Sequence, residues 1–209
     1  MNEEAPNRFV AKKITINDLK LKAESETIRV IEALEGQLIT KSLEFPAKII
    51  DGFAVSDTEQ DVLKLVVMNR YNAGKPAIAF IKNFGFTKGA IASTVAHDSH
   101  NIISVGVSDE DIVSAINLLI ESKGGISCVN KKEKIHLPLP VGGIMSNNDA
   151  FKTARDYERI DKKVKTLGTK LKSPLMTLSF MALLVIPELK LSDKGLFDGN
   201  QFSFTSVFI

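Results

Sequence analysis

The stretch Gly89-Ala-Ile-Ala-Ser-Thr-Val-Ala-His97-Asp98-Ser99-His100-Asn101-Ile102-Ile103 decides how the middle of this chain folds. Apolar and small residues alternate up to Ala96, and β-branched residues resume from Ile102 to Val107. Both runs are typical of strands. The sequence therefore predicts that the polar residues from His97 to Asn101 lie on the turn, or at the strand ends, between two strands.

These five polar residues have two interpretations. Histidines and carboxylates commonly meet at sites of metal binding or proton transfer. Alternatively, Asp98, Ser99 and Asn101 are residue types that bond the local backbone in turns. The second interpretation gives no reason for two histidines, and both stay open at this point.

Five sequence blocks, taken in order, resemble the C-terminal region of adenine deaminases, which belong to the amidohydrolase superfamily. The resemblance runs from about Thr27 to the last residue and is most specific from His97 to Asn101. It implies a linker or tail at residues 1–26 and an adenine deaminase C-terminal domain at residues 27–209. The blocks are GAIASTVAHDSHN at 89–101, Val105-Gly106 with 108–111, Leu137-Pro-Leu-Pro140 with Gly142-Gly143 and Met145-Ser146, 176–180, and 186–197.

The resemblance implies a hydrolase of purine salvage, which converts adenine to hypoxanthine and ammonia. In such an enzyme manganese or another divalent metal activates water for attack at the purine C6, because a bound metal lowers the pKa of water to about 7. The family's metal lies in an amidohydrolase barrel that precedes this region. A (β/α)₈ barrel typically needs about 250 residues, and the 209 residues here contain no His-x-His. We therefore expect this chain alone to hold no metal and to be inactive.

Within the resemblance, the polar turn is the candidate site. His97, Asp98 and His100 are expected to play accessory catalytic parts, as proton carriers or as groups that orient the metal's water. Histidine titrates near neutral pH, and a neighbouring carboxylate can fix its tautomer. Ser99 and Asn101 are expected to contact the substrate. No residue is assigned as a metal ligand with certainty.

Two other functions remain open. The chain is alternatively a non-catalytic module that acts as a lid over the catalytic domain, as an interface or as an oligomerisation surface. In that case an apolar face is exposed and a homo-oligomer or self-association is expected. A third hypothesis is a small self-sufficient metal site at His97, Asp98 and His100. The two histidines can supply two ligands, and Asp98 would have to be the third, because catalytic zinc sites generally use three protein ligands.

Composition excludes several classes of protein. An apolar share of 44% in 209 residues is ample for a buried core. A net charge of +2 with interspersed acids and bases gives no basic stripe for nucleic acid. The longest apolar stretch, residues 175–187, is about 13 residues, whereas a membrane span takes about 20. We expect adenine and the barrel domain as partners, and neither nucleic acid nor membrane.

The location is predicted to be cytoplasmic. Residues 1–8 are polar and are followed by no apolar core, so they do not resemble a secretory signal. The single Cys128 cannot form an internal disulfide, which fits a reducing compartment. Its place in an alternating apolar run predicts a buried structural thiol.

The whole pattern predicts an α+β fold with mostly antiparallel sheets and about three main helices. Ser56–Gln60 is predicted to open the first helix, which ends near residues 72–74, and Ser108 to cap the second, which ends at Gly124-Gly125. Asn147 or Asn148 is predicted to cap a third, amphipathic helix that reaches about Leu167.

The remaining segments are predicted mostly as strands. Residues 77–81 and 126–129 each follow a predicted helix, which suggests a possible internal helix-strand duplication. Ile135–Gly143 is expected at a sheet edge or as an extended segment, because its prolines lack amide donors, and Gly142-Gly143 permits a close backbone approach or a positive φ. The others are 27–34, 36–40 and 47–50 as an antiparallel meander, 175–186 as helix or strand, 189–197 as a turn-rich loop, and 201–208 as a closing strand.

Overall fold

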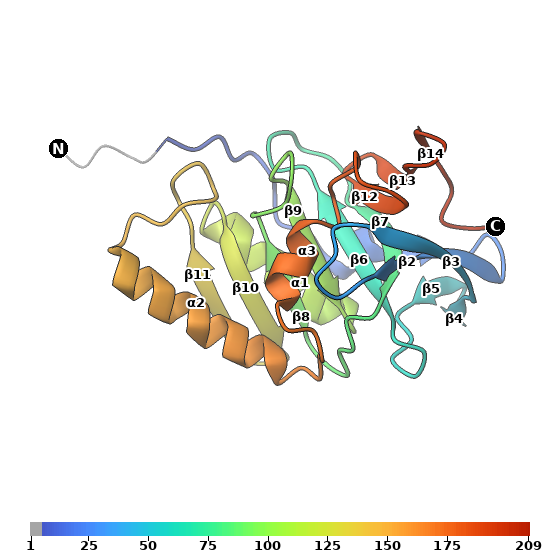
Figure 1. The fold of residues 1–209 in the computed structure, drawn as a ribbon, viewed down its shortest axis with the longest axis horizontal. Coiled ribbons are helices and arrows are strands. Elements are labelled where there is room, and N and C mark those ends of the chain that lie inside the picture. The colour runs from blue at the N-terminus through green and yellow to red at the C-terminus, as the bar shows by residue number, and fades with distance from the viewer. Residues whose placement is uncertain (1–5) are drawn as a thin grey trace.

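The structure is a computed structural model that describes residues 6–209, and it consists of a large central sheet with elements packed on both faces (Figure 1). The central sheet has eight strands in the order β11-β10-β8-β9-β6-β7-β2-β3. All neighbouring strands are antiparallel except β2 and β7. The predicted α+β fold, with mostly antiparallel pairing and three helices, is confirmed. The strands of this sheet are β2 (Thr27–Ala33), β3 (Thr40–Pro46), β6 (Val62–Met68), β7 (Ala77–Lys82), β8 (Ala90–Ser93), β9 (Ile102–Gly106), β10 (Gly125–Asn130) and β11 (Glu133–Pro138).

Two small sheets flank the central one. The first has the strand order β1-β5-β4, and the second has the strand order β12-β13-β14. These strands are β1 (Leu21–Lys22), β4 (Lys48–Ile50), β5 (Phe53–Val55), β12 (Leu189–Ser192), β13 (Gly195–Asp198) and β14 (Ser203–Phe204).

Helices cover both faces of the central sheet. On one face lie the short 3₁₀ helix η1 (Ile16–Leu19) and helix α1 (Asp109–Glu121), whose apolar residues pack on Val66 and Met68. On the other lie α2 (Ala150–Lys165), α3 (Pro174–Ser179) and the β12–β13 hairpin, whose apolar residues belong to the same buried cluster as Leu65 and Val67. Strand β6 is buried along its whole length for this reason.

Strand β6 corrects one prediction. Residues 62–68 were expected to be helical, but a strand covered on both faces loses the alternation of apolar and polar residues and shows a continuous apolar run. The residues expected to cap a helix form a turn instead, since Asp57 and Val62 exchange backbone hydrogen bonds. Without that helix, the proposed repeat of helix-strand units is absent from this part of the chain.

Helix α1 confirms its predicted start. The Ser108 hydroxyl accepts a hydrogen bond from the Asp111 amide at 3.2 Å, which satisfies one free amide of the first turn. Ile112, Ile116 and Leu119 are fully buried against the sheet. The helix ends at Glu121, three residues before Gly124, close to the predicted end.

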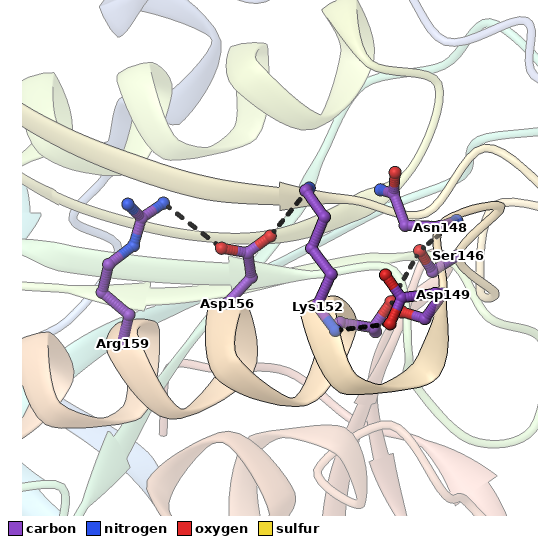
Figure 2. Close-up of polar contacts among 7 residues, drawn as sticks. Ser146, Asn148, Asp149, Lys152, Asp156 and Arg159 are labelled. Carbon is purple, nitrogen blue, oxygen red and sulfur yellow. Dashed lines mark hydrogen bonds and ion pairs between the residues drawn. The ribbon is translucent and has the colours of Figure 1, made fainter.

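Helix α2 is capped by Asp149, one or two residues after the predicted cap, and Asp149 accepts from the Lys152 amide at 3.0 Å. Figure 2 shows this cap and the ion pairs that Asp156 makes with Lys152 and Arg159 along the helix. The second half of α2 is anchored, because Ile160 and Val164 are fully buried.

The C-terminal quarter differs from its prediction in two places. Residues 189–197 form the β12–β13 hairpin and not a loop, because Leu189 and Leu191 pack on the central sheet while Asp193-Lys194 makes the turn. The predicted closing strand at 201–208 is reduced to the two residues of β14, although Phe208 bridges Ile28. The stretch 175–186, predicted as helix or strand, begins in the short helix α3 (Pro174–Ser179).

The N-terminal segment packs on the fold from Pro6 onward. Leu19 is fully buried, the Gly142 amide donates to the Pro6 carbonyl, and the Val10 amide donates to the Arg70 carbonyl. Figure 1 shows this segment running along one edge of the molecule. The first five residues of the predicted linker or tail lie outside the described residues, and the boundary at residue 26 stays a prediction.

Three smaller predictions concern the sheet edge, the thiol and the helices. Strand β11 is an edge strand, as its prolines indicated. Cys128 is buried, and burial raises the pKa of its thiol to about 12, so it is an inert structural residue as predicted. Across residues 6–209, none of the helices combines the length and the apolar character that a membrane span requires.

Candidate functional site

The polar residues lie where the sequence placed them, on the turn at residues 94–101 between β8 and β9. The His97 amide donates to the Ser179 carbonyl of α3 at 2.8 Å, and the His100 amide donates to the Ala96 carbonyl at 2.7 Å. His100 adopts a left-handed backbone conformation, with φ of 50°, which closes the turn. Backbone bonds therefore fix both histidines.

Arg70, two residues after the end of β6, holds the turn in place through a set of hydrogen bonds, the Arg70 clamp. It is 3% exposed, and its guanidinium donates to the His100 carbonyl at 2.6 Å, the Gly142 carbonyl at 2.7 Å and the Tyr71 hydroxyl at 2.7 Å. The Tyr71 hydroxyl in turn donates to the Ser99 carbonyl at 3.0 Å. Three segments distant in sequence, at residues 70–71, 99–100 and 142, are thereby bonded together at this turn.

Gly142 and Gly143 lie against the Arg70 side chain. Gly143 has a φ of 74°, and a Cβ at this position would lie 2.1 Å from Nη1 of Arg70. Only glycine allows the loop to approach the guanidinium so closely. The predicted close backbone approach at this pair is confirmed.

The two imidazoles lie next to each other in different environments. The His97 ring stacks on Phe180, with centroids 4.6 Å apart, and the His100 ring meets it edge-on at 5.5 Å. Neither ring nitrogen of His97 has a hydrogen-bond partner within the described residues, while Nδ1 of His100 is buried without a partner. Both residues are partly exposed.

Electrostatics favour neutral His100. Burial lowers its pKa, the neighbouring His97 and the Arg70 guanidinium lower it further, and the Asp98 carboxylate acts in the opposite direction. A neutral imidazole can both donate and accept a hydrogen bond.

The other predicted site residues divide into exposed and buried ones. Asp98 and Ser99 are exposed on the turn, whereas Asn101 is 5% exposed. The Asn101 side chain accepts from the Arg70 amide at 3.3 Å and donates to Asp193 at 3.2 Å. The turn thus brings all five residues together, but Asn101 also has a structural part.

A cavity of about 230 Å³ opens between this turn and the β12–β13 hairpin. Its wall combines apolar side chains with imidazole, hydroxyl, amide, carboxylate and ammonium groups. The lining residues are Val67, Ala96, His97, Ser99, Asn101, Ala182, Leu184, Ser192, Asp193, Lys194 and Phe204. Three of the five predicted site residues, His97, Ser99 and Asn101, therefore line one cavity.

Sequence reasoning missed Asp193 as a site residue. Its carboxylate accepts from the Asn69 side chain at 2.8 Å and from the Asn101 side chain at 3.2 Å. The sequence predicts a turn-rich loop for the segment Leu-Ser-Asp-Lys-Gly around it. The available signal was a carboxylate on a turn between apolar residues. A single sequence does not show that this turn lies next to Asn101, which is 92 positions away.

The third hypothesis, a self-sufficient metal site, finds no support in the geometry. Nowhere in residues 6–209 do three histidine, cysteine, aspartate or glutamate side chains come together as a group that could hold a metal ion. His97, Asp98 and His100 therefore do not form a three-ligand set. His136 lies on the edge strand β11, opposite Ser127 of β10.

Comparison with known proteins gives a consistent result. Residues 37–203 match the family model described as the adenine deaminase C-terminal domain. The chain is 50% identical over 203 residues to an adenine deaminase of Parabacteroides distasonis, a match that covers 97% of this chain and 37% of the relative. It is 49% identical to an adenine deaminase of Methanosarcina barkeri, with 99% of this chain and 39% of the relative covered. It is 43% identical to that of Borreliella burgdorferi, with coverages of 98% and 38%. The chain thus spans less than two fifths of the length of these relatives.

Proposed function

The chain belongs to the family of adenine deaminase C-terminal domains, and from this premise we propose that it serves an enzyme that hydrolyses adenine to hypoxanthine and ammonia. Water adds to C6 of the purine, the bond to the exocyclic nitrogen breaks, and ammonia leaves with the protons it needs. A divalent metal such as manganese, held outside the described residues, would activate the water. We propose no metal ligand among the residues of this domain.

The residues of the turn have chemistry that suits the proton movements of this reaction. His97 carries the proposal: it lines the cavity, is partly exposed, and leaves both ring nitrogens free of partners among the described residues. An imidazole with free ring nitrogens can carry a proton to a purine nitrogen. Neutral His100 and the exposed Asp98 lie beside it, and Ser99 adds a hydroxyl for the substrate.

The rigidity of the turn supports the same proposal. A catalytic group must be held within about 0.5 Å of its productive position by neighbours that are themselves fixed. The Arg70 clamp and the stacking on Phe180 provide that support. The proposed arrangement has the turn at the mouth of a catalytic barrel in the longer enzyme.

The test is turnover in an enzyme of the relatives' full length that carries this domain. We expect His97→Ala to lower kcat by about a hundredfold or more, within the range that a proton-transfer group contributes. His136→Ala on β11 is the matched control and should leave kcat unchanged. The chain of 209 residues should release no measurable ammonia from adenine with added manganese. Wild-type turnover in both His97→Ala and His100→Ala would disprove the site assignment.

A second function, as a covering or oligomerising module, is favoured by a separate observation. Phe151, Ala154 and Tyr157 on the first half of α2 are exposed, and a mostly apolar cavity of about 580 Å³ lies beside them. Such a face suits a packing partner, either the catalytic domain or a second copy. The two functions are compatible, since one domain can cover a partner with one face and reach its active site with a turn.

A further inference from the structure

Asp193 is a carboxylate at the wall of the 230 Å³ cavity that no cation neutralises directly. Two neutral amides hold it, Nδ2 of Asn69 at 2.8 Å and Nδ2 of Asn101 at 3.2 Å. Throughout the described chain, no lysine, arginine or histidine forms an ion pair with it. Because a carboxylate offers about four lone-pair sites, it retains acceptor capacity for a ligand.

The two amides are themselves fixed, so Asp193 is preorganised. Oδ1 of Asn69 accepts from the amides of Tyr71 and Asn72, at 2.8 and 2.9 Å, and Oδ1 of Asn101 accepts from the Arg70 amide at 3.3 Å. These bonds orient each side chain with its nitrogen toward Asp193. The carboxylate is thereby aimed before any ligand arrives, which reduces the ordering cost of binding.

His97 supplies a second polar contact in the same cavity, with its ring held by Phe180 and its nitrogens free. Phe204, which is 50% exposed, adds an aromatic ring from the second small sheet, and Val67, Ala182 and Leu184 add apolar surface. A volume of 230 Å³ corresponds to roughly eight water molecules, so one small bicyclic molecule fits. The complementary ligand is flat, apolar on its faces and rich in N–H donors at one edge.

We propose that this cavity binds an amino-substituted nitrogen heterocycle of the adenine type, with Asp193 accepting hydrogen bonds from its amino edge and His97 bonding a ring nitrogen. The inference rests on the proposed function only for the choice of adenine as ligand. It gives the C-terminal domain a substrate-recognition site of its own, formed by two residues about a hundred positions apart. Lys194 also lines the cavity, but it is exposed at the turn of the hairpin.

The cavity should distinguish adenine from hypoxanthine. Hypoxanthine carries a carbonyl oxygen where adenine has its amino group, so an acceptor would face the Asp193 carboxylate and one hydrogen bond would be lost. Sites built around a ligand's N–H donor reject analogues that lack it. We expect adenine to bind at least about tenfold more tightly than hypoxanthine.

The experiment titrates the 209-residue chain with adenine and with hypoxanthine, followed by calorimetry and by amide NMR shifts. We expect shifts at His97, Asp193 and Phe204, and about tenfold or more weaker adenine binding in Asp193→Asn. Asp51→Asn is the matched control with unchanged affinity, because Asp51 is exposed on a left-handed turn that asparagine tolerates. Thermal melting confirms that each variant is folded.

Three outcomes would overturn the inference: no adenine binding at millimolar concentrations, shifts confined to other surfaces, or equal affinity in folded Asp193→Asn. If Asp193→Asn does not fold, His97→Phe decides, because it keeps an aromatic ring on Phe180 and removes the ring nitrogens; unchanged affinity then overturns the inference. Failure of the proposed function is distinguishable, since unaltered turnover in His97→Ala of the longer enzyme leaves Asp193-dependent binding untouched.

Discussion

The turn from Thr94 to Asn101 and the first half of helix α2 both flank the central sheet, yet they are held in opposite ways. The turn is bonded to α3, to the end of β6 and to the β12–β13 hairpin. The first half of α2 makes ion pairs mainly within itself, as Figure 2 shows, and Phe151 is 79% exposed. The polar side chains of the turn are therefore held by their neighbours, whereas the apolar side chains at the start of α2 are not.

This difference separates two kinds of functional surface. Side chains that perform chemistry must be fixed by neighbours before the substrate arrives. An exposed apolar helix face needs no such fixation, because a partner that covers it supplies the packing. The turn has the properties of the first kind, and the start of α2 has those of the second.

The largest effect is expected from Arg70→Ala. The substitution removes the clamp and leaves the carbonyls of His100 and Gly142 without their donor in a buried place, at a cost of about 4 kcal/mol. Arg159→Ala on α2 is the control, and its exposed ion pair predicts a change within about 0.5 kcal/mol. Urea unfolding of both variants measures the contrast, and similar values would show that the turn is no more firmly held than α2.

The next largest effect distinguishes the two halves of α2. Ile160→Ala should reduce the free energy of unfolding by about 3 kcal/mol, since Ile160 is fully buried and its loss leaves a cavity. Phe151→Ala, at the exposed end of the same helix, should change it by less than about 0.5 kcal/mol. A large loss from Phe151→Ala would mean that the first half of α2 is packed in solution.

The sequence predicts these two regions unequally well. The polar turn was found because histidines between two β-branched runs stand out locally, and the cap at Ser108 was found for a similar local reason. For α2, the apolar stripe from Phe151 to Leu167 is continuous in sequence, so periodicity cannot tell which half is covered. That information resides in tertiary packing.

Two other features were hidden for physical reasons. Strand β6 is buried on both faces, and such a run is indistinguishable from a buried helix by period. Asp193 reaches the site only because β12 packs on the central sheet beside the turn, a contact between segments far apart in the chain. Local patterns therefore identify the part of the cavity wall that lies on the turn, and tertiary packing supplies the rest.

A smaller effect concerns Lys190, whose ammonium supports the site through the Phe180 carbonyl at 3.2 Å and the Leu38 carbonyl at 2.6 Å. Burial lowers its pKa from 10.5 to about 8. Between these values the unfolded chain holds a proton that the folded protein has released, so stability should rise with pH.

The expected gain from Lys190 between pH 8 and pH 10 is at most about 2 kcal/mol. Urea unfolding at several pH values measures it as the difference between the wild type and Lys190→Met, with exposed Lys170→Met as the control. A wild-type curve parallel to that of Lys190→Met across this range would contradict the lowered pKa.

The smallest change in stability, but a visible change in association, is expected from Phe151→Asp. Phe151 is the second residue of α2, where an acidic side chain interacts favourably with the helix dipole, so the free energy of unfolding should change by no more than about 0.5 kcal/mol. The substitution places a charge on the exposed apolar face beside the 580 Å³ cavity, where Tyr157 also lies.

If that face drives self-association, sedimentation of Phe151→Asp should show less oligomer at high concentration than sedimentation of the wild type. Arg155→Gln changes the net charge equally without touching the apolar face, and it should associate like the wild type. If the wild-type protein is strictly monomeric, the first half of α2 does not form contacts between copies. The catalytic domain is then its expected partner.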